Sequence, residues 1–546
     1  MMTLMVMSPA TTVHGQTTDA PAGGAEHLSA PASATPAEHA SEGGGEHKAD
    51  VPIYWVLPFA LFLGCIALAP LFFSHFWEHK YPLVAGAFFL IGFGYYFLVR
   101  GDLHPWTHEM REYVSFIALL FALFVVSGGI VIHVSRKATP SINVSLLLTG
   151  AIIANIFGTT GAAMLLIRPY IRINRKHIKP YHIIFFIFLV ANVGGCLTPV
   201  GDPPLFLGYL KGVPFWWVLE HCWQPWLVAT LMLLAIFYVF DKRDHAREER
   251  HDWGENDTGA AVRVNGMVNL LLILIVILAV FRESMFDAKG VLDLLTSREV
   301  MMVATALVSL KLTKKAVHEA NEFKFAPIRE VAIIFLAIFS TMVPALEYLD
   351  KNADRMPLKT TGQFYFSTGA LSSVLDNAPT YLTFLQARLG EIDAEQVREA
   401  RQAIQTAYDP YEADTPKYKS DASRPPLITY VPKSLAPEVL AAVNTAIRYY
   451  EADIIAQKGH IDEAKLKLAF LIGVPALNGF LIAISVGAVF FGAMTYIGNA
   501  PNFMVKSIAE SSGIKMPSFL GYVFKYSAVI LLPVLVVIWL IFFIPR

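Results

Sequence analysis

The sequence predicts an all-α polytopic membrane protein with two inverted repeats, each containing a re-entrant hairpin and a broken transmembrane helix. Of the 546 residues, 55% are hydrophobic and only 16% are charged, whereas soluble domains carry about 25% charged residues. The apolar runs are continuous and about 20 residues long, which suits spanning helices and not the alternating strands of a membrane barrel. A twelve-residue phrase also occurs twice in the chain.

The repeated phrase is the strongest functional signal in the chain. Residues 195–206 read G-C-L-T-P-V-G-D-P-P-L-F, and residues 492–503 read G-A-M-T-Y-I-G-N-A-P-N-F. Gly and Pro break a helix, and such a break is tolerated at membrane depth only where the backbone is buried in protein or lines a cavity. Paired interrupted segments in matching positions of two halves indicate the binding site of a transporter.

Composition divides the chain into a tail, two repeats and an insertion. Residues 1–50 combine a signal-like start with a stretch rich in Ala, Gly, Ser, Pro, Glu and His, which predicts a disordered tail. Residues 51–264 form the predicted first transmembrane repeat and residues 265–546 the second. Within the second repeat, residues 388–465 are charged and polar, and we predict an extramembrane insertion with amphipathic helices.

Ten apolar segments are predicted to span the membrane, and two more are interrupted by Gly, Thr or Pro. The spans are 51–73, 81–99, 112–134, 181–210, 214–240, 265–281, 299–313, 327–349, 466–505 and 520–544. The interrupted segments, 143–167 and 363–387, are the predicted re-entrant hairpins.

The order span, hairpin, broken span occurs once in each half. Arg111-Glu112 begins one such span and Arg329-Glu330 begins the other. With both hairpins re-entrant, the Lys and Arg clusters fall on one side of the membrane, which is then the inside; they lie at 136–137, 168–179, 241–264 and 311–324. The two copies then run in opposite directions, as in many secondary transporters.

Two carboxylates are the leading candidates for the transport site. Asp202 and Asp376 each lie at a helix break within apolar sequence, and an ionisable residue there is a functional hypothesis by default. Such a site can exchange a proton for a metal cation near neutral pH. Sodium favours oxygen ligands, so we assign it to Asp202 and Asp376. Further oxygens come from Asn377, Asn499, Thr159, Thr160, Thr198, Thr380, Thr495 and the backbone around Gly201 and Gly498.

Other interpretations of these polar residues remain open at this point. Asp202 and Asn499 could merely cap the half-helix that follows each of them. Asn155 and Asn192 either line the same cavity or form interhelical hydrogen bonds. Asn502 offers a further carbonyl oxygen.

Several classes of function are disfavoured by what the chain does not contain. There is no P-loop, no H-E-x-x-H and no G-x-S-x-G motif, so the sequence predicts neither an enzyme nor ATP drive. A net charge of −1 without a basic cluster gives no indication of nucleic-acid binding. The three cysteines have neither disulfide nor metal-site spacing, and no cofactor is expected beyond transported Na+ and H+.

Four stretches resemble the ion transporter superfamily, which includes NhaD-type sodium/proton antiporters, CitMHS-type citrate/metal carriers, the arsenite permease and the divalent anion/sodium symporters. They are residues 155–169, 192–204, 376–380 and 498–501. The resemblance implies two inverted repeats, a homodimer and an elevator-like motion. The anion symporters carry Ser-Asn-Thr at the hairpin tips, whereas this chain has Gly158-Thr159-Thr160 and Asp376-Asn377-Ala378-Pro379-Thr380, a difference that favours cation and proton exchange.

Three functional hypotheses follow. The leading one is a sodium/proton antiporter with alternating access, located in the bacterial inner membrane, whose partners are a small cation, protons and the lipid bilayer. The alternative is a carrier for citrate, another carboxylate or an arsenite-like anion, which would use the positive ends of the half-helices. The third is a membrane sensor that acts through the 388–465 insertion.

Overall fold

The computed structural model describes residues 51–135, 139–175, 177–248, 261–281, 297–321, 323–352, 357–414 and 425–544. The predicted tail at 1–50 lies outside these residues. So do Arg136, Lys137 and Lys176, residues 249–260 of the loop used to argue orientation, and residues 415–424 of the insertion.

Eight helices within the described residues are long and apolar enough to cross a membrane, so the chain is an all-α polytopic membrane protein, as predicted. These candidate spans are His79–Arg100, His104–Gly128, Pro140–Ile173, Pro180–Leu197, Phe215–Ala246, Ala326–Asn352, Pro475–Met494 and Phe519–Phe542. The apolar helices at Ile53–Ile66 and Val268–Val280 are shorter.

The first half of the described chain contains eight α-helices and three shorter helical segments. In chain order they are a 3-10 turn (Ile53–Val56), α1 (Leu57–Phe72), α2 (Ser74–Gly94), a π-helical turn (Tyr95–Arg100), α3 (His104–Gly128), α4 (Pro140–Ile173), α5 (Pro180–Leu189), a 3-10 turn (Val193–Leu197), α6 (Pro203–Leu210), α7 (Phe215–Glu248) and α8 (Val268–Val280).

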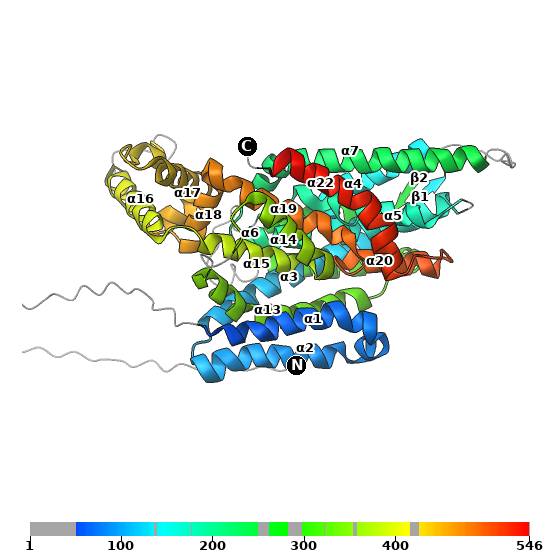
Figure 1. Cartoon of the computed structure of the whole chain (residues 1–546), viewed down its shortest axis with the longest axis horizontal. Helices are drawn as coiled ribbons and strands as arrows, with labels where there is room; N and C mark the ends of the chain where they lie inside the picture. Colours follow the sequence, from blue (N-terminus) through cyan, green and yellow to red (C-terminus); the bar gives the residue numbers. More distant parts are fainter. Residues whose placement is uncertain are drawn as a thin grey trace, which may run out of the picture. The chain divides into compact units, whose positions relative to one another are not determined.

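The regular elements described in the second half are all helical. Its elements are α11 (Arg298–Leu312), α12 (Lys315–Ala320), α13 (Ala326–Asn352), α14 (Thr361–Val374), α15 (Asn377–Gly390), α16 (Ala394–Asp414), a 3-10 turn (Leu427–Tyr430), α17 (Pro437–Ala456), α18 (Glu463–Gly473), α19 (Pro475–Phe491), a 3-10 turn (Gly492–Met494), α20 (Ala500–Ser511), α21 (Phe519–Tyr522), a π-helical segment (Val523–Leu531) and α22 (Leu532–Phe542). In Figure 1, α13 lies beside α1 and α2.

A two-stranded antiparallel sheet corrects the predicted span 112–134. The helix α3 ends at Gly128, and β1 (Val131–Ser135) pairs with β2 (Ala261–Asn265). Two consecutive glycines at 128–129 disfavour helix, and the β-branched residues that follow favour an extended strand. The amide of Asn321 donates to the carbonyls of Gly128 and Ile130 and so satisfies the helix end.

The element α4 is a helical hairpin and not one long helix. Its backbone reverses at Gly158, whose φ of 73° and ψ of 157° are non-helical. Asn143 and Asn174, near its two ends, exchange hydrogen bonds of 2.9 and 2.8 Å, although a continuous helix would separate them by roughly 46 Å. The predicted hairpin at 143–167 is therefore confirmed. Asn143 also donates to Asp241 on α7 at 2.9 Å, which ties the base of the hairpin to α7.

A second hairpin is formed by α14 and α15, as predicted for 363–387. The chain is interrupted at Leu375, whose backbone is extended, and Asp376 immediately precedes α15. The rings of Phe364 and Phe384 lie 6.2 Å apart, so the two arms run side by side.

Both predicted broken spans are interrupted at the repeated phrase. In the first copy α5 ends at Leu189, Thr198 is extended, and Asp202 immediately precedes α6. In the second copy α19 ends at Phe491, Thr495 is extended, and Asn499 immediately precedes α20.

The 388–465 insertion contains α16 and α17, which share a hydrophobic core with α18. In Figure 1 these three helices gather at one end of the view, on the opposite side from α5 and the β-strands. The contacts that join this unit to the rest of the described chain include one hydrogen bond and one ion pair. The Tyr450 hydroxyl donates to the Gly212 carbonyl at 2.8 Å, and the Lys467 ammonium lies 3.3 Å from the Asp350 carboxylate at the end of α13.

Candidate functional site

The first break is held open by a threonine and an asparagine. The Thr198 hydroxyl donates to the Asn155 carbonyl on the first hairpin at 2.6 Å and accepts from the Gly201 amide at 3.1 Å. The Asn155 side chain donates to the Gly194 carbonyl at 2.7 Å and accepts from the Leu197 amide at 2.8 Å. These bonds replace the helical ones that the break removes, so the unwound segment has one defined path.

The second break uses the matching threonine in the same way. The Thr495 hydroxyl donates to the Ser373 carbonyl on the second hairpin at 2.6 Å, and it accepts from the Gly498 amide at 3.1 Å. Each hairpin thus receives a hydrogen bond from the threonine of the phrase. Thr198 and Thr495 therefore serve as supports of the breaks, and neither lines the main cavity.

The last glycine of each phrase is required by close backbone approach. A Cβ placed on Gly201 would lie 2.2 Å from the Gly195 carbonyl oxygen, and one on Gly498 would lie 2.6 Å from the Gly492 carbonyl oxygen. Both separations are shorter than the non-bonded contacts that a Cβ atom makes in proteins. The spacing of the two glycines in the phrase thus has the same physical cause in both copies.

The two breaks contact each other through asparagines. The Asn192 side chain donates to Asn502 at 2.7 Å, and Asn502 donates in turn to the carbonyls of Gly492 and Thr495 at 2.8 and 2.9 Å. Of the alternatives for Asn192, the interhelical hydrogen bond is the one observed. The Asn502 amide group thus satisfies two backbone carbonyls of the second break.

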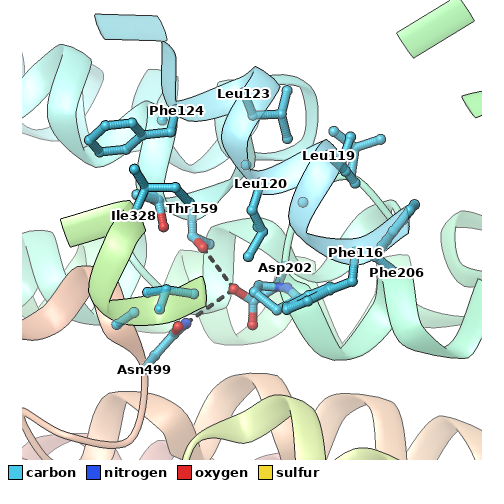
Figure 2. A pocket seen from close by; sticks show the side chains of 18 of the residues that line it. Phe116, Leu119, Leu120, Leu123, Phe124, Thr159, Asp202, Phe206, Ile328 and Asn499 are labelled. Atoms are coloured by element: carbon cyan, nitrogen blue, oxygen red, sulfur yellow. Dashed lines mark hydrogen bonds between the residues drawn. The ribbon is translucent and has the colours of Figure 1, made fainter. Parts of the chain in front are cut away.

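Asp202 is the point at which both hairpins and both breaks converge. Its carboxylate, 1% exposed, accepts from the Thr159 hydroxyl at 2.7 Å, from the Asn377 amide at 2.5 Å and from the Asn499 amide at 3.1 Å. Figure 2 shows the Thr159 and Asn499 bonds reaching the same carboxylate oxygen. Asn377 and Thr159 come from the tips of the two hairpins, so segments that are distant in the chain meet here.

Two amide oxygens beside Asp202 lack hydrogen-bond partners among the described residues. Asn377 and Asn499 each use their NH2 group on Asp202, which leaves the Oδ1 atom of each buried and unpaired. A buried polar atom without a partner costs roughly 1–3 kcal/mol. If either amide turned, its oxygen would face Asp202, and a cation could then be held by that oxygen together with the carboxylate.

Asp376 differs from Asp202 in both exposure and partners. It is half-buried, lines the same cavity, and caps α15 by accepting from the Ala378 amide at 3.1 Å. The Thr380 hydroxyl donates to the Asp376 carbonyl at 3.0 Å, so Thr380 supports the hairpin tip.

The capping interpretation of Asp202 and Asn499 is wrong. Both residues occupy the N-cap position, but neither side chain makes a capping hydrogen bond. Their side chains instead bond each other across the two breaks.

A cavity of about 70 Å³ adjoins Asp202. Its polar residues are Thr159, Thr160, Asp202, Asp376 and Asn499, with Gly201 among the backbone that lines it. Among the described residues that line it, none is Lys, Arg or His. The opposite wall is apolar and comes mainly from α3 and α13 (Figure 2); it includes Phe116, Leu119, Leu120, Leu123, Phe124, Ile328, Val331 and Phe335.

Three helix N-termini also meet at this point. Asp202, Asp376 and Asn499 are the residues immediately before α6, α15 and α20, and hydrogen bonds to Asp202 hold Asn377 and Asn499 next to it. Helix N-termini carry partial positive charge and unpaired N–H groups, which favour anions. The site thus combines carboxylates with a field that attracts negative charge.

A buried charged cluster on α3 and next to α6 was not predicted from the sequence. Glu109 and Glu112 on α3 lie next to Lys211, the residue that follows α6. Lys211 comes 102 positions after Glu109 in the chain. Only the spacing of the two glutamates on one helix face could have indicated them.

The apolar spans, the paired breaks and the central site define a multi-pass membrane transporter. The chain belongs to the family described as "Putative citrate transport", whose model matches residues 48–543. No curated protein matched the chain.

Membership of this family changes the balance between the functional hypotheses. It supports the alternative, a carrier for citrate or a related carboxylate, in general terms. It gives no support specific to the NhaD-type sodium/proton antiporter that was the leading hypothesis.

Proposed function

We propose that the protein is a secondary carrier that moves citrate or a related carboxylate together with a cation, and that Asp202 is the cation ligand. Family membership supports the carboxylate. The observation that carries the proposal is the Asp202 site, where a buried carboxylate lies beside two unpaired amide oxygens, Asn377 Oδ1 and Asn499 Oδ1. These are hard oxygen ligands of the kind that Mg2+ and Ca2+ prefer.

The charges around the cavity explain why a carboxylate would need a companion cation. A multiply charged anion near Asp202 and Asp376 is repelled, and no basic side chain among the described lining residues compensates. A cation bound between the anion and Asp202 removes that repulsion. The N-termini of α6, α15 and α20 then stabilise the remaining negative charge of the substrate.

Uptake of labelled citrate into proteoliposomes tests the proposal. We expect uptake by the wild-type protein to require Mg2+, Ca2+ or Na+ added singly, and to fall by about 100-fold in Asp202→Asn, equivalent to about 2.7 kcal/mol. The matched control is Asp244→Asn, which removes a carboxylate paired with Lys179 at 2.9 Å, away from the cavity; its uptake should equal that of the wild type.

Two outcomes would overturn the proposal. One is citrate uptake that persists unchanged in Asp202→Asn. The other is sodium-dependent collapse of a preset proton gradient without any carboxylate, abolished in Asp202→Asn, which would restore the sodium/proton antiporter.

A further inference from the structure

A second cluster of buried charges lies at the junction of α3 and α6. The Lys211 ammonium contacts the Glu109 carboxylate at 2.5 Å and the Glu112 carboxylate at 3.0 Å. The His108 ring nitrogen lies 3.9 Å from Glu109 and 3.8 Å from Glu112. The cluster is outside the cavity that adjoins Asp202, since none of these residues lines it.

The two carboxylates outnumber the single ammonium. Glu109 is 8% exposed, and its second oxygen, Oε2, is buried without a hydrogen-bond partner among the described residues. With His108 neutral, the cluster carries one uncompensated negative charge. Such a charge is costly in a buried environment unless a proton or a cation joins it.

We propose that Glu109, Glu112 and Lys211 form a second ion-binding site, which takes up one proton during the transport cycle. This inference rests on the proposed carrier function. A proton needs only one carboxylate lone pair, and the two glutamates offer it between them, since the single ammonium of Lys211 can neutralise only one of them. A metal ion held by His108, Glu109 and Glu112 would compete with Lys211, which already lies between the two carboxylates.

Few other charges act on the cluster. The helices α6 and α8 carry no acidic or basic residue, and those of α4, Arg168 and Arg172, lie within its last two turns. On α11, Glu299 pairs with Arg298 and accepts from Ser115, and on α13, Arg329 and Glu330 act on Tyr81. The charged groups that act on Glu112 are Glu109, Lys211 and His108.

The helix α6 connects the two ion sites directly. Its eight residues, Pro203–Leu210, lie between Asp202 and Lys211 and span roughly 12 Å. Protonation of either glutamate removes one of the two carboxylates that hold Lys211, and so weakens the anchor of α6 on α3. The proton at one end of α6 and the substrate cation at the other are thereby coupled.

The experiment measures accumulation of labelled citrate with its required cation in proteoliposomes, at imposed pH gradients and with the membrane potential clamped. One coupled proton changes the accumulation ratio by about tenfold per pH unit, since 1.36 kcal/mol corresponds to one unit. We expect Glu112→Gln to lose one such factor, so that its accumulation ratio responds less steeply to the pH gradient than that of the wild type. Glu347→Gln, which removes the partner of Arg100, is the matched control and should retain the full gradient response.

A second variant gives an effect of opposite sign. Lys211→Gln removes the positive charge, so the two carboxylates hold a proton more tightly. Its uptake should reach half-maximum at a pH about 1–3 units higher than in the wild type. This result keeps the proposal testable if Glu112→Gln does not fold.

The outcomes separate this proposal from the carrier function itself. A wild-type protein without citrate uptake contradicts the carrier function. Wild-type uptake with an equal gradient response in Glu112→Gln, or a Lys211→Gln profile that does not move, overturns the proton site. The proton site is also overturned if uptake is independent of the pH gradient but requires Mn2+, and if Glu112→Gln no longer requires Mn2+.

Discussion

The two breaks of the transmembrane helices share their supports but differ in the residue that reaches the centre. Thr198 and Thr495 make the same pair of hydrogen bonds, and Gly201 and Gly498 meet the same backbone constraint. The residue after the glycine is Asp202 in one break and Asn499 in the other. The inverted relation of the two halves remains a prediction.

The surroundings explain why only one of the two positions carries a carboxylate. Asp202 faces three donors, which suits an acceptor-only side chain. The Asn499 amide instead donates to the Ala191 carbonyl at 3.2 Å, to Asn192 at 3.3 Å and to Asp202 at 3.1 Å. The two similar breaks therefore hold a single carboxylate, that of Asp202, and Asn499 is one of its hydrogen-bond donors.

Exchanging the two residues should have the largest effect. In the double variant Asp202→Asn, Asn499→Asp the carboxylate would face the acceptors of Ala191 and Asn192 without any donor from them. We expect citrate uptake to fall by about 100-fold, as in Asp202→Asn alone, because the lost cation site is worth about 2.7 kcal/mol. Recovery of uptake in the double variant would mean that the two breaks are interchangeable.

Replacing Gly201 or Gly498 by alanine should destabilise the protein to different extents, because the two glycines lie at different distances from the neighbouring backbone. A methyl group on Gly201 meets a carbonyl at 2.2 Å and one on Gly498 at 2.6 Å, so Gly201→Ala should lower the free energy of unfolding more. Overpacking of this kind costs roughly 1–3 kcal/mol. Thermal unfolding in detergent measures the difference. Gly94→Ala is the matched control, because a Cβ at Gly94 meets open space; an equal loss in all three variants would contradict the backbone constraint.

Asn155 and Ser373, whose carbonyls accept the hydrogen bonds of Thr198 and Thr495, should also differ in their contribution to stability. Asn155→Ala leaves the Leu197 amide without its partner and should cost about 2–3 kcal/mol. Ser373 donates to its own helix at Gly369 and only at 3.4 Å to Phe491, so Ser373→Ala should cost about 1 kcal/mol or less. Equal losses in thermal unfolding would show that the breaks are supported alike.

The smallest effect is expected from the second carboxylate. Asp376 is half-buried, and an asparagine can still accept from the Ala378 amide. Asp376→Asn should therefore change the KM for citrate by about threefold, equivalent to about 0.65 kcal/mol. A loss as large as that of Asp202→Asn would make the two carboxylates equal partners.

The sequence predicted the positions of the helix breaks and hairpins around the site better than the roles of its side chains. The phrase located both breaks, and Gly158 and Asp376 marked the hairpin turns, because Gly, Pro and isolated acids disfavour an uninterrupted helix in apolar surroundings. It did not distinguish Asp202 from Asp376, since burial and donors come from distant residues such as Asn377. It also missed the β-strand pair and the contacts of Lys211 with Glu109 and Glu112, which depend on long-range folding.

The apolar wall opposite Asp202 has a consequence for leakage. Phe116, Leu123 and Phe335 offer no hydrogen bonds, so if the proposed carrier moves its site past them, there are no polar contacts to break and remake. They equally offer nothing to a bare carboxylate, whose desolvation against hydrocarbon costs several kcal/mol. A carrier with an ionised Asp202 and no bound cation would therefore not move its site across the membrane. The ion gradient would then not be dissipated without transport of the substrate.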